Sequence, residues 1–240
     1  MTIVRVGVEW INNFPPSGQA CSQNDLSWCN AQAEGFATHM GNHGHTQVFD
    51  WGDSNAWETD FRNPDFGGGG DSLNWSDNVH FCFFDDHGGN WNGIMHIAFA
   101  SQHNQCMGSS DTWRLGAGMM KWFVLAGCQG VLGTDTPSVI GVWGAPMQGV
   151  HLVLAFIGDS MDTWWTASMG SDFADDVCNG KAICGTWLDH AYNWWTGDKA
   201  IAIASGETQD DAINRRENET LDWRDWSVSI NAWMAWKWRE

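Results

Sequence analysis

Basic residues are scarce in this chain of 240 residues. Eleven lysines and arginines stand against 29 aspartates and glutamates, and the formal net charge at pH 7 is -18. Binding to a phosphate backbone or an anionic membrane needs a positive surface, so this balance argues against nucleic-acid and membrane partners. We expect a peptide or small-molecule substrate instead, and the acidic surface favours a cationic one. The sequence leaves the oligomeric state open.

Long apolar runs are also absent. None approaches the roughly 20 residues that span a bilayer. Residues 1–14 carry Arg5 and Glu9 in a strand-like alternation rather than in the apolar core of a signal peptide. We therefore predict a cytoplasmic location.

No CxxC pair occurs among the cysteines. Seven scattered cysteines, an odd number, do not resemble a disulfide framework. Only Cys128 has neighbours that suggest chemistry, and nothing in the sequence indicates a cofactor. We interpret the other six as small buried hydrophobes: Cys21, Cys29, Cys82, Cys106, Cys178 and Cys184.

Tyrosine occurs once, whereas tryptophan occurs 19 times. Tryptophan combines a large apolar area with one N–H donor, so it suits substrate pockets as well as cores. Trp143, Trp164 and Trp165 are candidates for a substrate-binding wall, with core packing as the alternative. Arg114 is a further candidate, since a guanidinium can hold a carboxylate; the alternative is a surface ion pair.

Short apolar runs alternate with helical patterns along the chain. Helical patterns cover 25–40 and 172–195, the second interrupted near Gly180. This alternation predicts an α/β fold with a mostly parallel sheet covered on both faces. Without repeats or a clean boundary, we predict one domain over 1–240, with a Trp-rich C-terminal extension from about 207 in which Trp233 and Trp236 have helical spacing. The strand-like runs are 2–10, 46–50, 79–84, 94–100, 119–126, 150–157 and 200–204.

Two of the strongest predicted strands end in chemically competent groups. FFDDHGG places His87 after the run 79–84, and VLAGCQG places Cys128 after the run 119–126. Carboxyl ends of parallel strands meet at one edge of a sheet, so neighbouring strands would bring the imidazole to the thiol. The imidazole could then hold the thiol as thiolate, and the N–H groups of Gly88 and Cys128 could form an oxyanion hole. Asp85 or Asp86 could orient the imidazole; solvated loop carboxylates are the alternative.

These two blocks carry a resemblance to a known superfamily. FFDDHGG resembles the Asp-His-Gly block of legumains, VLAGCQG is similar to the Ala-Cys-x-Gly block of caspases, and GVHLVLAFIGD resembles the strand that follows the nucleophile. In element order over 2–205 the chain resembles the clan CD cysteine peptidases, above all uncharacterised bacterial caspase-like domains.

The resemblance implies a caspase-hemoglobinase-like three-layer α/β sandwich. It implies Cys128 as nucleophile, His87 as general acid and base, and Gly88 as an oxyanion donor. Legumains keep an asparagine after the first strand that orients the histidine, and Asn12 or Asn13 stands at that place.

The predicted activity is therefore cysteine-dependent hydrolysis of an amide or ester bond through an acyl-enzyme. A Trp-lined site that excludes water would favour acyl transfer or cyclisation in small-molecule biosynthesis instead. A catalytically inert dyad would leave a caspase-like binding module.

One rival site is the histidine cluster His39, His43 and His45, which could ligate zinc or nickel. Histidines near a helix C-terminus also interact favourably with the helix dipole, which is a sufficient reason for them. We predict no metal.

Overall fold

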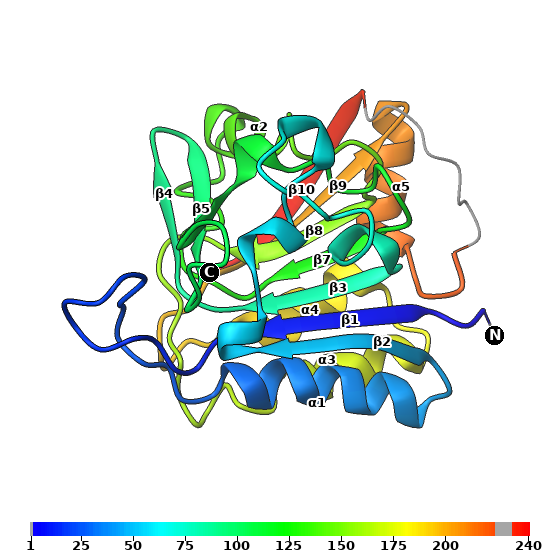
Figure 1. The fold of residues 1–240 in the computed structure, drawn as a ribbon. Coiled ribbons are helices and arrows are strands. Elements are labelled where there is room, and N and C mark those ends of the chain that lie inside the picture. The colour runs from blue at the N-terminus through cyan, green and yellow to red at the C-terminus, as the bar shows by residue number, and fades with distance from the viewer. Residues whose placement is uncertain (1, 224–231) are drawn as a thin grey trace.

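A seven-stranded sheet organises the chain in the computed structural model, which describes residues 2–223 and 232–240 (Figure 1). The strand order is β10-β9-β8-β7-β3-β1-β2. Strands β8, β7, β3, β1 and β2 run parallel to one another. Strand β9 is antiparallel to both of its neighbours, β8 and β10. The predicted mostly parallel α/β sheet is confirmed. The bounds are β1 (Arg5–Trp10), β2 (Thr46–Gly52), β3 (Phe81–Asp85), β7 (Trp122–Leu125), β8 (Leu152–Phe156), β9 (Ala200–Gly206) and β10 (Trp233–Arg239).

Both faces of this sheet are covered (Figure 1). Helices α1 (Cys29–Asn42), α3 (Met169–Cys178) and α4 (Ile183–Ala191) pack on one face. Helix α5 (Gln209–Asn218) packs against β9, β10 and α4. Helix α2 and a second sheet lie over the other face. Their bounds are α2 (Thr136–Trp143), β4 (Gly88–Trp91), β5 (Ile94–Ala98) and β6 (Met107–Ser109).

The two-sided cover explains the continuous apolar runs in the sequence. In β3, Phe81 and Phe83 pack on the side of α1, and Cys82 and Phe84 pack on the opposite side. A strand that is buried on both faces needs apolar side chains at successive positions, without polar alternation. Such runs therefore predicted the central strands well.

The first helix begins later than the predicted range of 25–40. Helix α1 starts at Cys29 because two carboxylates hold the preceding segment in another conformation. Asp25 accepts a hydrogen bond from the Phe14 N–H at 2.8 Å, and Asp162 accepts from the N–H groups of Ser27 and Trp28. Asp162 lies far along the chain, so local sequence could not show this start.

The predicted helix over 172–195 is two helices, α3 and α4. The chain turns between them at Gly180, whose φ of 86° lies in the left-handed region that favours glycine. The predicted interruption near Gly180 is confirmed.

The Trp-rich C-terminal segment completes the fold. The predicted helical face of Trp233 and Trp236 is wrong, because both lie in β10, which pairs with β9 along its length. The Trp236 side chain donates a hydrogen bond from Nε1 to the Thr134 carbonyl at 2.8 Å. Residues 224–231 of this segment lie outside the described residues. Among the described helices, none has the length and apolar character needed to cross a bilayer.

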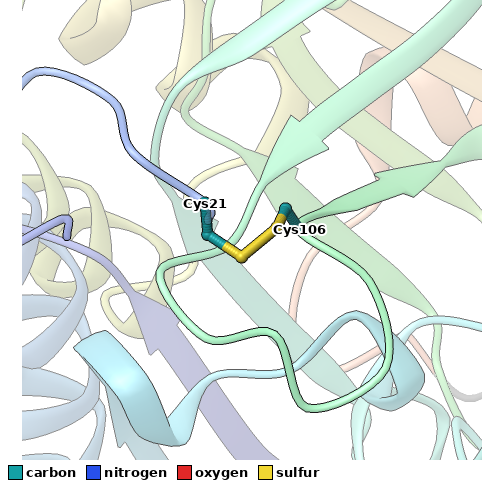
Figure 2. The surroundings of a disulfide bond; sticks show 2 residues. All are labelled: Cys21 and Cys106. Atoms are coloured by element: carbon teal, nitrogen blue, oxygen red, sulfur yellow. A yellow bond between two sulfur atoms is a disulfide. The ribbon is translucent and has the colours of Figure 1, made fainter. Parts of the chain in front are cut away.

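One disulfide joins Cys21 to Cys106, across 85 positions of sequence. Figure 2 shows it between the segment that precedes α1 and the loop that leads into β6. The interpretation of these two cysteines as buried hydrophobes is wrong. The two cysteines are 85 residues apart, so their spacing in the sequence could not indicate that they pair. The odd number of cysteines also argued against disulfides in general.

Candidate active site

The two predicted blocks meet at one edge of the sheet. Strands β3 and β7 are adjacent and parallel, with Phe84 in register with Leu125, so both loops leave the sheet side by side. A Cβ atom added at Gly88 would lie 2.3 Å from the carbonyl oxygen of Cys128 and 3.1 Å from its nitrogen. The backbones of the two blocks are therefore in contact, and only glycine at position 88 permits it.

His87 and Cys128 line the same pocket, which has a volume of about 340 Å³. Its walls come from the carboxyl ends of β3, β7 and β8, from the segment before α1, and from the loops before α3 and β9. This is the edge at which parallel α/β sheets place their ligands, because the strand-end loops converge there.

The imidazole of His87 is oriented by a backbone group. Its Nε2 lies 2.8 Å from the carbonyl oxygen of Asn24, and the Phe14 ring packs against it with centroids 5.4 Å apart. Because a carbonyl can only accept, Nε2 carries the proton in this hydrogen bond. In the neutral imidazole Nδ1 is then unprotonated and available as a base.

The side chains predicted to orient His87 have other surroundings. Asn12 bonds to Asn30 at 2.8 Å, and Asn13 bonds to Asp53 at 2.8 Å. Asp85 and Asp86 are buried at the end of β3. Sequence reasoning missed the Asn24 carbonyl because a main-chain acceptor leaves no signature in residue type.

The thiol of Cys128 lies in the turn that follows β7. Its Sγ is 3.4 Å from both the nitrogen and the carbonyl oxygen of Ser160. Gln129 follows with a left-handed φ of 58°, accepts from the Asn90 N–H at 3.0 Å, and donates to Asp159 at 3.0 Å. Gln129 therefore connects the turn at Cys128 to β4 and to the loop after β8. Between the described residues, no hydrogen bond joins the imidazole directly to the thiol; their partners are Asn24 and Ser160.

Cys128 differs from the other free cysteines in its exposure. It is partly exposed, whereas the other four free thiols in the described chain are buried. Burial raises the pKa of each of those four thiols: Cys29, Cys82, Cys178 and Cys184. Among the free thiols of the described residues, the accessible one is therefore Cys128, the cysteine that the sequence motif selects.

The backbone around Cys128 can accommodate an oxyanion. The Cys128 N–H donates no hydrogen bond to another residue in the part of the chain that the structure describes. The Gly88 main chain lies against it without an intervening side chain. That these two N–H groups form an oxyanion hole stays a prediction.

The pocket is strongly acidic. Among its lining residues, all of which are described, there is no lysine or arginine. Oδ2 of Asp85 is buried and has no hydrogen-bond partner among the described residues. Burial raises the pKa of Asp85 and Asp86 well above the ordinary range, so bringing a cation to them would favour their ionised forms. Five aspartates line the pocket: Asp25, Asp85, Asp86, Asp162 and Asp198.

His87 also lines a separate hollow of about 220 Å³. Gly88 lines it too, together with Gln23, Trp91 and Met107. His87 thus belongs to the lining of two cavities.

Two of the predicted substrate-binding residues do not face the pocket. Trp143 is fully buried in the core, where its Nε1 donates to the Gly130 carbonyl at 3.0 Å. Arg114 precedes β7, on the side of the sheet opposite to the strand ends, and its guanidinium stacks over the Phe66 ring at 4.3 Å. Neither side chain lines this pocket, so the structure does not bring Trp143 or Arg114 to the predicted dyad.

Trp164 and Trp165 are not among the residues that line the pocket, although they adjoin lining residues in the sequence. They are stacked at 3.5 Å and 60% and 62% exposed, between the pocket-lining residues Asp162 and Thr166. Sequence reasoning did not select the pair Trp194 and Trp195. These rings are 4.0 Å apart on the turn before Asp198, which also lines the pocket.

The histidine cluster has acid and backbone partners. His39 and His43 share Oδ1 of Asp175, at 2.9 Å and 3.2 Å. His45 is buried, and its Nδ1 accepts from the Val4 N–H at 3.2 Å. No group of three potential ligands that could hold a metal occurs within the described residues.

Comparison with known proteins places the chain in one family. A comparison with curated proteins gives no match. A family model described as "Domain of unknown function (DUF6345)" matches residues 8–240, nearly the whole chain. The chain therefore belongs to the DUF6345 family.

Proposed function

We propose that this protein is a cysteine-dependent hydrolase of the caspase-hemoglobinase type, which cleaves an amide or ester bond beside a cationic group. The contact between the backbones of Gly88 and Cys128 carries the proposal, because it brings the two motif blocks to one pocket. The resemblance to clan CD peptidases supports the same assignment through the motif residues.

The chemistry follows from the positions of these groups. The Cys128 thiol gives its proton to Nδ1 of His87, and the sulfur attacks the substrate carbonyl carbon. The N–H groups of Cys128 and Gly88 stabilise the resulting oxyanion. As the oxyanion collapses, the leaving amine or alcohol takes the proton from His87, and a thioester remains on Cys128. Water then attacks the thioester with His87 as base, which releases the acid and restores the thiol.

The pocket supports a cationic substrate. Asp85 is buried with one unpartnered oxygen, and no lining residue of the pocket supplies a permanent positive charge. A lysine- or arginine-like group would satisfy that oxygen, because an ammonium or guanidinium donates hydrogen bonds to carboxylates. The two cavities that share His87 favour a peptide over a compact small molecule.

The disulfide bears on the predicted cytoplasmic location. Disulfides persist mainly in oxidising compartments. We infer that the protein works in such a compartment, in contrast to the location predicted from the sequence.

The test is the pH dependence of Cys128 alkylation in the native protein. If His87 acts on the thiol, iodoacetamide labels Cys128 at pH 6, where an ordinary thiol with a pKa near 8.5 is mostly unreactive. His87→Ala should shift the labelling to higher pH. His39→Ala removes a histidine on α1 that bonds to Asp175, so it is a matched control and should leave the profile unchanged. Equal profiles for the native protein and His87→Ala would favour an inert binding module.

Acyl transfer is a second candidate, favoured by two exposed tryptophan pairs that adjoin pocket-lining residues in the sequence, Trp164–Trp165 and Trp194–Trp195. An acyl-enzyme formed from a basic ester would be mixed with an amine acceptor. Hydrolysis predicts free acid as the main product, whereas transfer predicts the amide of the added amine.

A further inference from the structure

Another hollow, away from the candidate active site, is lined mainly by three tryptophans and one acid. Trp51 in β2, Trp57 and Trp75 line a cavity of about 250 Å³ together with Asn55 and Asp60. We call Trp51, Trp57, Trp75 and Asp60 the tryptophan cage. None of its residues lines the candidate active-site pocket.

The walls of the cage are held in place. The rings of Trp51 and Trp75 are 5.5 Å apart with planes at 79°, so they form two walls close to a right angle. Trp75 donates from Nε1 to Asp71 at 3.1 Å. Trp57 stacks on His103 at 3.8 Å and donates from Nε1 to the Ser54 carbonyl at 2.8 Å. Two of the three indole N–H groups are thus engaged with neighbouring residues.

Two buried carboxyl groups lie close to these rings. Asp60 is 2% exposed, and its Oδ2 accepts from the Trp57 N–H at 3.2 Å. Glu9 is the register neighbour of Trp51, is fully buried, and has no hydrogen-bond partner for either carboxylate oxygen among the described residues. The nearby Arg62 is bonded to Glu58 at 2.8 Å. Two acids therefore lie close together in the core without a basic partner of their own in the described contacts.

The charge of Asp60 acts on Glu9. Burial raises the pKa of Asp60 to about 7, and the pKa of Glu9 is raised by burial and by the charge of Asp60. A cation placed in the cage would relieve this repulsion and stabilise the ionised carboxylate.

We propose that the tryptophan cage binds a methylated ammonium group, such as that of choline or trimethyl-lysine. Indole faces attract a cation through the ring quadrupole, most strongly when water is excluded. Methyl groups suit a cavity with aromatic walls because they do not need hydrogen-bond acceptors. Asp60 is the one carboxylate among the residues that line the cavity, and it matches one positive charge.

The first experiment compares choline with 3,3-dimethylbutan-1-ol by calorimetry. The alcohol has the same shape without the charge, so we expect it to bind at least about tenfold more weakly. Asp60→Asn and Trp51→Leu should each weaken choline binding by about tenfold or more. Trp233→Leu removes a tryptophan of β10 that is 50% exposed and outside the cage, so choline affinity should stay unchanged.

The outcomes that would overturn the proposal are specific. Equal affinity for choline and the neutral alcohol would do so, as would unchanged choline affinity in an Asp60→Asn protein that melts at the native temperature. If Asp60→Asn fails to fold, Trp75→Phe tests the cage at another lining residue. The smaller ring should weaken choline binding, and unchanged affinity in a folded Trp75→Phe protein would contradict the proposal.

The source of the group is a separate arm of the experiment. N-acetyl-trimethyl-lysine amide is titrated beside choline and beside the unmethylated lysine amide. If either methylated probe binds more tightly than the unmethylated lysine amide, the result supports the cage. Whichever methylated probe binds more tightly indicates whether the natural ligand carries a choline or a trimethyl-lysine group. No binding of either methylated probe at about 10 mM would contradict it. The titrations are repeated in Cys128→Ala, which separates this site from the proposed hydrolase.

Discussion

Buried carboxylates are the residues through which pH should act on this protein. Asp60, Asp85 and Asp86 are each at most 3% exposed, and burial raises the pKa of all three. An acid with a raised pKa in the folded state holds a proton that it loses on unfolding. Such groups stabilise the fold at low pH and cost stability as pH rises through the folded pKa.

Asp60 allows this effect to be measured. Its pKa is about 7 in the folded state against 3.8 ordinarily, so its contribution should decline between pH 4 and pH 7 by about 1.4 kcal/mol per pH unit. Asp60→Asn cannot titrate and should gain relative stability at pH 8 over pH 5. Urea unfolding at both values measures the difference. Parallel pH profiles in the two proteins would contradict the shifted pKa.

Asp85 should determine preference for a basic substrate. Asp85→Asn keeps the shape of the side chain but removes the charge that would pair with a lysine- or arginine-like group. We expect KM for an arginine ester to rise by about tenfold, while the citrulline ester, which is uncharged, changes little. Asp210→Asn, an exposed acid on α5, is the control. A similar loss for both esters would indicate a structural role only.

At the scale of elements, the contact between β4 and the turn at Cys128 leaves no room for a side chain at Gly88. Gly88→Ala would place a methyl 2.3 Å from the Cys128 carbonyl oxygen, so the two loops must separate. We expect a cost of about 1–3 kcal/mol and loss of the Cys128 labelling at pH 6.

The matched control is Gly141→Ala, on the exposed side of α2. An added Cβ there meets nothing within 4 Å, and alanine is the better helix former. Gly141→Ala should be neutral or stabilising by up to about 1 kcal/mol, with unchanged labelling. Equal effects of the two substitutions would show that the contact at Gly88 is not important.

The disulfide secures the segment that orients His87. Cys21 lies three residues before Asn24, and Cys106 directly precedes β6. Replacing both cysteines by serine should cost about 4 kcal/mol, because the bond closes a long loop with a sequence separation of 85. The alkylation profile of Cys128 should also move to higher pH. Reductant should lower the urea midpoint of the native protein and leave that of the double variant unchanged. An unaltered urea midpoint of the native protein after reduction would contradict this role of the disulfide.

Across the whole molecule, the net charge of -18 should guide substrates towards the site. Long-range attraction of a cation is screened when salt shortens the Debye length from about 10 Å at 0.1 M to about 3 Å at 1 M. We expect kcat/KM for the arginine ester to fall over this range, while kcat/KM for the citrulline ester stays nearly constant. Identical salt dependence for both esters would exclude electrostatic steering.

Much of the fold and of the candidate site followed from local patterns. Apolar runs marked the central strands because burial on both faces demands them. His87 and Cys128 follow two such runs, so the sequence predicted that they meet at one edge if the two strands are neighbours. The structure shows that β3 and β7 are neighbours. The acidic character needed only a count of charges. Strand period, strand ends and net charge are properties that neighbouring residues or composition carry by themselves.

The rest depended on contacts between residues far apart in the chain. Only the tertiary structure decided that the Asn24 carbonyl orients His87, that Cys21 meets Cys106, and that Trp143 is buried while Trp164 is exposed. It also turned a C-terminal segment with helical spacing into the edge strand β10. A backbone acceptor, a distant partner and a degree of burial arise when elements pack together, so no local pattern of side chains encodes them.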